Sequence, residues 1–263
     1  MWLDGGVAGN CVRNSVVSEV LYGPGNDIQL IAKEHLKTAW VWDLEENALR
    51  FIGNLSYGIV HGILGGLVVW SPDGRYVALP CSDLSEAGST GQIFVINMET
   101  GESRRLTSFV GSSTLPRWSP DGKSIMYVRM PPKYWRYPGI TNDVEGADIW
   151  VVDIDGSNEK QLTDTPKNWE EGFWSPDGKR IVYASYMGVG ETRGIEIWMM
   201  NEDGSDKRPL TTITTGFIVR MVWSPDGSKI AVVTWESVED GIDRDIYVID
   251  MPATEDVKNE NHT

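Results

Sequence analysis

The pentapeptide Trp70-Ser71-Pro72-Asp73-Gly74 (WSPDG) occurs four times in this chain, the later copies beginning at Trp118, Trp174 and Trp223. Proline at the second position and glycine at the fourth position of Ser-Pro-Asp-Gly favour a type I turn followed by a left-handed residue, which is a hairpin corner. A run rich in β-forming residues follows each copy, at 76–79, 124–128, 180–184 and 229–233. Each copy therefore predicts a strand, a turn and a second strand.

Two further recurring segments extend the repeat to four strands. Similar segments at 92–97, 148–153, 196–201 and 245–250 predict a third strand. A fourth strand is predicted by Leu-Thr pairs that lie twelve residues after the third-strand aromatic, at 106–107, 162–163 and 210–211. The motif tryptophans are 48, 56 and 49 residues apart, and the longest spacing contains an insertion of eight residues. This period, with four short antiparallel strands in each unit, is typical of propeller blades.

A degenerate fifth copy opens the chain. Its turn is Tyr22-Gly23-Pro24-Gly25-Asn26, 48 residues before Trp70, and strands are expected at 28–32, 39–43 and 48–52. We predict a single all-β domain, a β-propeller of four-stranded antiparallel blades with five blades, and six blades stay open as an alternative. The expected blades cover about residues 16–54, 66–108, 115–164, 171–212 and 219–259.

The last blade lacks its Leu-Thr strand, because the position twelve residues beyond Tyr247 is Asn259, within a polar tail. Residues 7–13 form a short unassigned segment near the N-terminus. Pairing this segment as the outer strand of the last blade would remove an exposed sheet edge. We therefore expect residues 7–13 to close the last blade.

The motif WSPDG-K/R-x-I, followed by D-I-W/Y-V-x-D/N-x-D-G-S-N and L-T, resembles the repeat of TolB-type propellers over about residues 16–252. Similar repeats occur in the propeller domains of prolyl-oligopeptidase-like peptidases and in oligogalacturonate lyases, so the resemblance implies a fold more strongly than an activity. TolB propellers have six blades, whereas five are counted here. The resemblance implies a periplasmic or extracytoplasmic location, but the chain shows no signal peptide and the residues themselves leave the compartment unknown.

The composition suits one globular all-β domain, with 263 residues, 41% hydrophobic residues and 12 tryptophans. The repeat itself accounts for most of these tryptophans, because a flat aromatic at the same place in each blade packs against the next blade. We expect core packing for the motif residues Trp70, Trp118, Trp174 and Trp223 and for the third-strand residues Trp150 and Trp198.

The formal net charge of −15 argues against nucleic acid as a partner and favours a cationic protein or peptide. The chain contains no run of 18 or more apolar residues, so membrane insertion is not predicted. Cys11 and Cys81 are too few for a disulfide framework, and we expect both to be reduced. The oligomeric state is not indicated by any of these features.

The candidate ligand-binding face carries the connections between second and third strands and the crossings between blades, which vary from blade to blade, whereas the motif turns repeat. The insertion in the third blade places three aromatic and two cationic residues among prolines. The candidate ligand-binding residues are Tyr134, Trp135, Arg136, Tyr137, Trp169, Glu170, Glu171, Trp235, Arg117 and Arg220. A capping loop without a ligand is the alternative for the insertion, and pairing with a neighbouring carboxylate is the alternative for Arg117 and Arg220.

No catalytic residue, metal ligand or cofactor is predicted. The chain has no G-x-S-x-G and no H-E-x-x-H motif, and its three histidines are scattered. Asp153–Asn158 resembles the start of a calcium loop, but the later glutamate is missing and the segment recurs as a hairpin tip. We therefore expect a non-catalytic propeller that binds a protein or peptide segment. The alternatives are a carbohydrate-active propeller (a glycosidase, lyase or lectin), for which Glu170, Glu171, Glu239 and Asp240 are the clustered acids, and an accessory domain of a larger protein.

Overall fold

A computed structural model describes residues 17–22, 28–33, 38–43, 48–54, 58–59, 69–82, 91–131, 147–164, 170–187, 194–214, 217–238 and 241–252. All regular structure in these ranges is β-strand, as the repeat predicts. Among them no helix is long and apolar enough to span a membrane.

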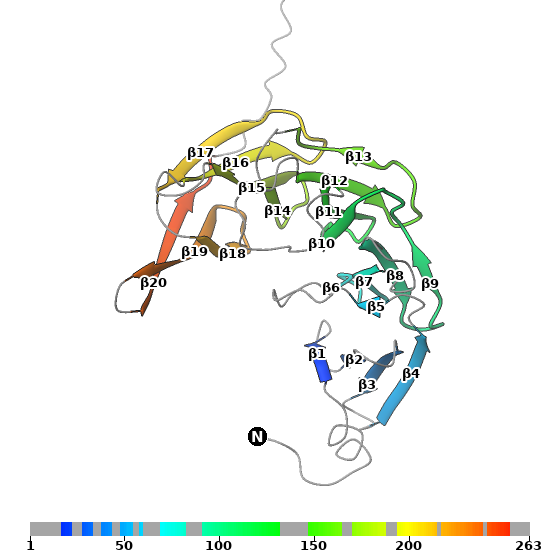
Figure 1. Ribbon diagram of the computed structural model, residues 1–263. Coiled ribbons are helices and arrows are strands. Elements are labelled where there is room, and N and C mark those ends of the chain that lie inside the picture. The colour runs from blue at the N-terminus through cyan, green and yellow to red at the C-terminus, as the bar shows by residue number, and fades with distance from the viewer. Residues whose placement is uncertain are drawn as a thin grey trace, which may run out of the picture. The chain divides into compact units, whose positions relative to one another are not determined.

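The described strands form five antiparallel sheets, in which consecutive strands pair as meanders, except that β5 and β6 both pair with β7 (Figure 1). The first sheet contains β1 (Val17–Tyr22), β2 (Ile28–Lys33), β3 (Thr38–Asp43) and β4 (Ala48–Asn54). The second contains β5 (Gly58–Ile59), β6 (Val69–Trp70), β7 (Tyr76–Ser82), β8 (Gln92–Asn97) and β9 (Ser103–Arg105). The third contains β10 (Ser112–Trp118), β11 (Ser124–Met130), β12 (Asp148–Asp153) and β13 (Lys160–Gln161).

The fourth sheet contains β14 (Glu170–Trp174), β15 (Arg180–Met187), β16 (Gly194–Asn201) and β17 (Arg208–Ile213), and the fifth contains β18 (Phe217–Trp223), β19 (Lys229–Val238) and β20 (Gly241–Asp250). The chain divides into two compact units, residues 1–172 and 173–263. Each unit has an apolar core between sheets. Ile93, Trp118 and Tyr127 belong to the core of the first unit, and Ile197 and Val232 belong to that of the second.

The motif turn has the predicted conformation. In the second copy, Gly122 N–H donates to the carbonyl of Ser119 (2.9 Å), and Gly122 has a φ of 71°. The Ser119 hydroxyl donates to Asp121 Oδ1 (2.7 Å) and accepts from the Ser124 N–H (3.0 Å). The other three copies repeat these bonds, and their glycines also have positive φ. The type I turn with a left-handed glycine is therefore confirmed.

Two of the motif tryptophans also link their sheet to the preceding one within a unit. Trp118 Nε1 donates to the carbonyl of Val69 (3.0 Å), and Trp223 Nε1 donates to the carbonyl of Phe173 (3.2 Å). A Cβ added to Gly122 would lie 3.7 Å from Pro72 Cδ, so neighbouring motif turns stack at van der Waals distance. Trp118 and Trp223 therefore provide a hydrogen bond between sheets as well as apolar area.

The predicted burial of the tryptophans is only partly confirmed. Trp118 is buried, whereas Trp70, Trp174, Trp223, Trp150 and Trp198 are half-buried. Polar side chains contact two of these half-buried tryptophans. The guanidinium of Arg129 lies 3.6 Å from the centroid of the Trp150 ring, and Trp198 Nε1 donates to Glu196 Oε2 (2.9 Å).

The Leu-Thr pairs play two different roles. In the second and third sheets the strand ends before the pair, at Arg105 and Gln161, and the threonine hydroxyl then takes the place of a ladder carbonyl. Thr107 Oγ1 accepts from the Ile93 N–H (3.0 Å) and Thr163 Oγ1 accepts from the Ile149 N–H (2.9 Å). In the fourth sheet the pair at 210–211 lies within β17.

The prediction of five four-stranded blades is wrong for the described part of the chain. Four sheets have at least four strands, but the last sheet has only β18, β19 and β20. The physical reason is that the chain after β20 lacks the Leu-Thr pair that lies in or directly after the fourth strand of the second, third and fourth sheets. Residues 7–13, expected to complete this sheet, lie outside the described residues.

Replacing Gly178 with valine should destabilise the protein by about 1–3 kcal/mol, because the glycine has a φ of 72° and a β-branched residue is strained there. Urea unfolding followed by circular dichroism measures the change. Gly194→Val is the control, because this glycine begins a strand and a Cβ there has no heavy atom closer than 3.9 Å. Equal effects of the two substitutions would contradict the proposed role of positive φ.

The motif aspartates should make stability depend on acid pH. The hydrogen bond from Ser71 is the main reason that the pKa of Asp73 is lowered to about 2, and the pKa of Asp121 and Asp177 is also lowered, mainly by the equivalent serines. Since an unfolded aspartate has a pKa of about 3.9, the stabilisation is present above pH ~4 and is lost as the pH falls to about 2. Asp73→Asn and Ser71→Ala should each make the free energy of unfolding vary less with pH in this window. Unchanged slopes in urea titrations at pH 2–7 would refute this role.

Candidate functional site

Charged residues follow β-bulges in the first strands of three sheets. The pairing of β10 with β11 shifts register between Thr114 and Arg117, and the pairing of β18 with β19 shifts between Ile218 and Arg220. The pairing of β1 with β2 shifts between Val17 and Glu19. Bulges redirect side chains and are frequent beside functional sites. In three sheets, the first strand therefore has a charged residue directly after a β-bulge.

The bulge in β10 contains a strained residue. Leu115 has a φ of 53°, which is uncommon for a residue other than glycine, and Pro116 follows it. The side chain of Leu115 is half-buried against Val128, Met130 and Ala147. Since packing holds the backbone in this conformation, the position of Arg117 is determined by the core beneath it.

Arg117 forms an ion pair with Glu171. The guanidinium Nη2 donates to Glu171 Oε1, so that the first strands of the third and fourth sheets, β10 and β14, are joined within the first unit. The side chains are 31% and 23% exposed, respectively. Desolvation at this level strengthens a charge-assisted hydrogen bond, while both groups stay accessible to solvent.

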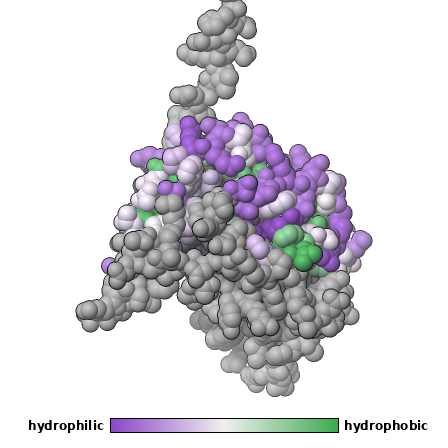
Figure 2. Space-filling model, turned by 45° about the horizontal axis from the view of Figure 1, so that its top comes forward, coloured by the Kyte–Doolittle hydropathy of each residue, from purple (hydrophilic) through white to green (hydrophobic). Residues whose placement is uncertain are grey.

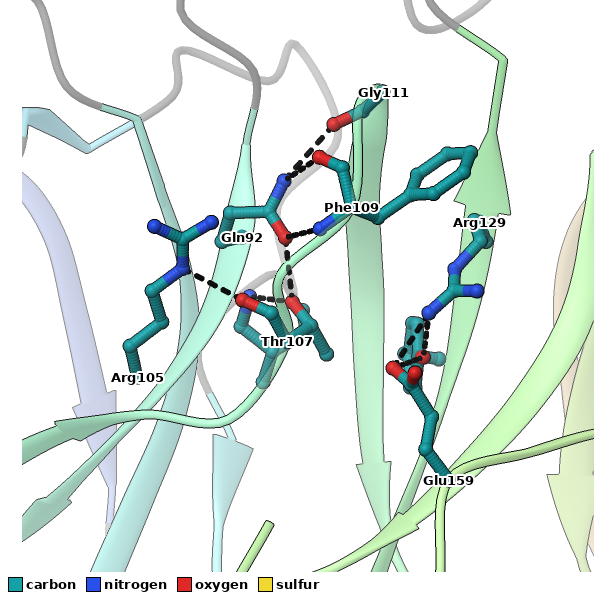
Figure 3. Close-up of polar contacts among 9 residues, drawn as sticks. Gln92, Arg105, Thr107, Phe109, Gly111, Arg129 and Glu159 are labelled. Carbon is teal, nitrogen blue, oxygen red and sulfur yellow. Dashed lines mark hydrogen bonds and ion pairs between the residues drawn. The ribbon is translucent and has the colours of Figure 1, made fainter.

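Gln92 fixes the segment that leads into β10 (Figure 3). Its Nε2 donates to the carbonyls of Phe109 and Gly111, each at 2.9 Å, and its Oε1 accepts from Thr107 Oγ1 (2.9 Å) and the Phe109 N–H (3.2 Å). The residue is 3% exposed. The side-chain amide thus uses both donors and both acceptor sites on the crossing between β9 and β10, and these bonds hold the start of β10 in place.

Arg129 anchors the same crossing from the third sheet (Figure 3). Its guanidinium lies 4.5 Å from the Phe109 ring centroid and donates to Glu159 Oε1 (2.5 Å) and Tyr127 Oη (3.0 Å). Burial, followed by the hydrogen bond to Glu159, raises the pKa of Tyr127. Because the cation is stacked and paired, Arg129 serves the scaffold rather than a ligand.

Sequence reasoning did not select Gln92 or Arg129. A signal for Gln92 was present, because the third strands begin with a polar residue in several repeats, as at Asp148, Glu196 and Asp245. No repeated pattern marks Arg129, since the same position in other repeats holds Cys81, Ser185 or Thr234.

The structure brings together two of the predicted ligand-binding residues, Arg117 and Glu171. Arg220 is exposed on β18, in the second unit. Glu170 and Trp235 belong to β14 and β19, and their side chains are not among those described. Tyr134, Trp135, Arg136, Tyr137 and Trp169 lie outside the described residues, as do Glu239 and Asp240.

The turn side of the second and third sheets has a shallow depression of about 510 Å³ between the motif turns. Its charges are paired locally, Arg75 with Asp73 (2.7 Å) and Lys123 with Asp121 (3.3 Å). Figure 2 shows one face of the molecule, on which the described surface is mainly hydrophilic with small hydrophobic patches. Within the described ranges, no group of three or more His, Cys, Asp or Glu side chains is placed to hold a metal ion.

Comparison with known proteins supports the fold. No family model matches the chain. A solved oligogalacturonate lyase in complex with manganese aligns with a TM-score of 0.62 at 13% identity, over 89% of this chain and 76% of that one. A putative TolB from Agrobacterium tumefaciens aligns with a TM-score of 0.52 at 19% identity, over 90% of this chain and 77% of that one. These likenesses show an all-β propeller fold of antiparallel sheets, and TolB proteins are among its structural neighbours.

Curated relatives match over short parts of their length. The uncharacterized peptidase YuxL of Bacillus subtilis (strain 168) is 30% identical over 127 residues, which are 47% of this chain and 17% of that protein. Dipeptidyl-peptidase 5 of Porphyromonas gingivalis is 36% identical over 70 residues, which are 27% of this chain and 9% of that protein. The chain thus matches less than a fifth of the length of either peptidase.

The Arg117–Glu171 pair should contribute about 1 kcal/mol of coupling free energy, because both groups are partly buried. A double-mutant cycle with Arg117→Gln and Glu171→Gln, measured by urea unfolding at 50 mM and 500 mM NaCl, tests this, and the coupling should fall at high salt. The same cycle for Lys123 and Asp121, which are 80% and 56% exposed, should give a smaller value. Additive effects of the Arg117 and Glu171 substitutions would contradict the expected coupling.

Proposed function

We propose that this protein is a non-catalytic, TolB-like propeller that binds a protein or peptide segment of cationic character. The observation that supports this proposal most directly is the partly exposed Arg117–Glu171 pair on the first strands of two sheets, next to a bulge. First strands line the central channel of a propeller, so charges held there are available to a ligand. The repeated motif turns on the other side have their charges paired locally.

The neighbouring sequence provides the other elements of a binding surface. The insertion supplies Tyr134, Trp135, Arg136 and Tyr137, and Trp169 and Glu170 directly precede Glu171. Aromatic side chains typically dominate binding energy at hot spots, and acidic residues beside them select cationic groups. The net charge of −15 adds long-range attraction for a positively charged partner. Arg220 and Trp235 are further proposed ligand-binding residues, on β18 and β19 of the second unit.

A carbohydrate-active propeller is the second candidate. It is supported by the likeness to an oligogalacturonate lyase and by a cation on a first strand, Arg117 on β10, which suits an acidic sugar. A role as an accessory domain of a larger protein is supported by the small share of each peptidase that the chain matches. The carbohydrate-active alternative involves Arg117 as well, so variants of the proposed site residues distinguish the two ligands.

Trp135→Ala and Trp169→Ala should each weaken binding of a cationic ligand about 30-fold or more, since truncation of a hot-spot aromatic costs about 2 kcal/mol. The probe is a panel of synthetic Lys/Arg-rich peptides, measured by calorimetry at 150 mM NaCl against charge-reversed Glu-rich peptides. Trp2→Ala is the matched control, because Trp2 lies outside the repeats.

The outcomes separate the candidates. Binding of the Lys/Arg-rich peptides that both tryptophan variants weaken supports the proposal. Equal affinity of Trp135→Ala, Trp169→Ala and the parent protein, with unchanged folding, would place the site elsewhere. Binding of oligogalacturonate instead of the peptides, lost in Arg117→Gln, would favour the carbohydrate-active alternative.

A further inference from the structure

Val110 is the most exposed large apolar side chain in the described part of the chain, at 80%. The others are on β18 and β20 of the second unit, where Ile246 and Val248 occupy the repeat positions of the buried Ile93 and Val95. In the first unit, every other large apolar side chain whose exposure is described is buried or half-buried. Val110 is therefore an exception to the packing of its own unit.

The crossing that carries Val110 lies at the end of the sheets where the candidate ligand-binding face is expected. β8 begins at Gln92, after the connection from β7, and β10 begins at Ser112, which pairs with Met130 at the end of β11. A Cβ added to Gly111 would lie 2.3 Å from the Met130 carbonyl oxygen, so the crossing packs against the point at which the connection to β12 begins. Val110 is therefore on the same face as the connections between second and third strands.

The backbone on both sides of Val110 is held by groups inside the protein (Figure 3). The Gln92 amide donates to the carbonyls of Phe109 and Gly111, each at 2.9 Å, and the Gly111 N–H donates to the Phe109 carbonyl (3.0 Å). From the third sheet, the guanidinium of Arg129 stacks on the Phe109 ring, 4.5 Å from its centroid. The crossing is thus fixed before a ligand binds, which lowers the entropic cost of a contact there.

The repeat does not require an apolar residue at this position. Four residues after the leucine of the next two Leu-Thr pairs the chain has Pro166 and Thr214, where this crossing has Val110. Apolar side chains that are exposed singly are common on protein surfaces. Val110 differs from such cases because the residues beside it are held in place while its own side chain has no cover. A fixed aliphatic side chain on a candidate binding face suits contact with an apolar group of a ligand.

The distance from the crossing to the Arg117–Glu171 pair restricts the ligand. β10 begins at Ser112, beside the crossing, and Arg117 is five residues further along the strand, which corresponds to about 16 Å at about 3.3 Å per residue. An extended peptide has the same rise per residue. A segment that runs along β10 with a lysine or arginine beside Glu171 therefore brings a side chain about five residues away to the crossing.

We propose that Val110 is an apolar contact of the ligand-binding face, and that the ligand is an amphipathic segment with an aliphatic side chain about five residues from a lysine or arginine. This inference rests on the proposed function, because the cationic part of the segment is the ligand proposed above. It adds the apolar part of the ligand and the residue that contacts it.

A pair of synthetic peptides tests the contact. One peptide has a Lys-Arg pair and a leucine about five residues away, and the second has alanine in place of the leucine. The parent protein should bind the leucine peptide about fivefold more tightly in calorimetry, since burial of roughly one or two methylene groups gives a difference of this size. Val110→Ser should reduce this preference to about onefold, whereas Val110→Ile should keep it.

Val248→Ser is the matched control. It makes the same substitution at a valine that is 63% exposed, on β20 of the second unit, and it leaves the crossing unchanged. This variant should keep the preference of the parent protein for the leucine peptide. Circular dichroism and urea unfolding of each variant check that the fold is unchanged.

The outcomes separate this inference from the proposed function. Equal binding of both peptides by the parent protein, while Trp135→Ala and Trp169→Ala still weaken binding, would overturn the inference and leave the proposed function intact. An equal loss of preference in Val248→Ser and Val110→Ser would also overturn the inference, because the effect would not depend on the crossing. Absence of binding to either peptide would contradict the proposed function and this inference together.

Discussion

The hydrogen bond between the motif serine and aspartate is the interaction on which the rest of the structure depends. It closes a turn in which one serine hydroxyl donates to a carboxylate and accepts from a backbone N–H five residues later. Because the turn is rigid, the strands on either side leave it in a fixed register. Four repetitions of one local geometry thus define the corner between the first and second strands in four sheets.

The motif tryptophan converts this local geometry into packing between sheets. In two copies its indole N–H donates to the carbonyl of the residue before the motif tryptophan of the preceding sheet, Trp118 to Val69 and Trp223 to Phe173. The glycine of one turn leaves room for the proline of its neighbour, as at Gly122 and Pro72. The same pentapeptide therefore contains residues that form the turn and residues that contact the neighbouring sheet, and this explains why the motif is repeated as a unit.

The repeats differ from one another in their β-bulges and in the crossings between sheets. The crossing into β10 is held by the buried amide of Gln92 and by Arg129 stacked on Phe109. The bulge that follows, with Leu115 at positive φ, determines where Arg117 meets Glu171. The candidate site is therefore supported by a buried amide and a stacked cation, a common arrangement in which a rigid scaffold positions a few functional groups.

The sequence alone determined the turn conformation, the strand positions, the first degenerate repeat and the candidate charges at Arg117 and Glu171, because each of these follows from local propensity or from a fixed period. Only the tertiary structure decided that these two charges form a pair, that Gln92 and Arg129 hold the crossing, and that Ile246 and Val248 are exposed although their equivalents are buried. The physical reason is that pairing and burial depend on the neighbouring sheet. A repeat specifies the residue at each position, but it carries no information about contacts between residues that are far apart in the sequence.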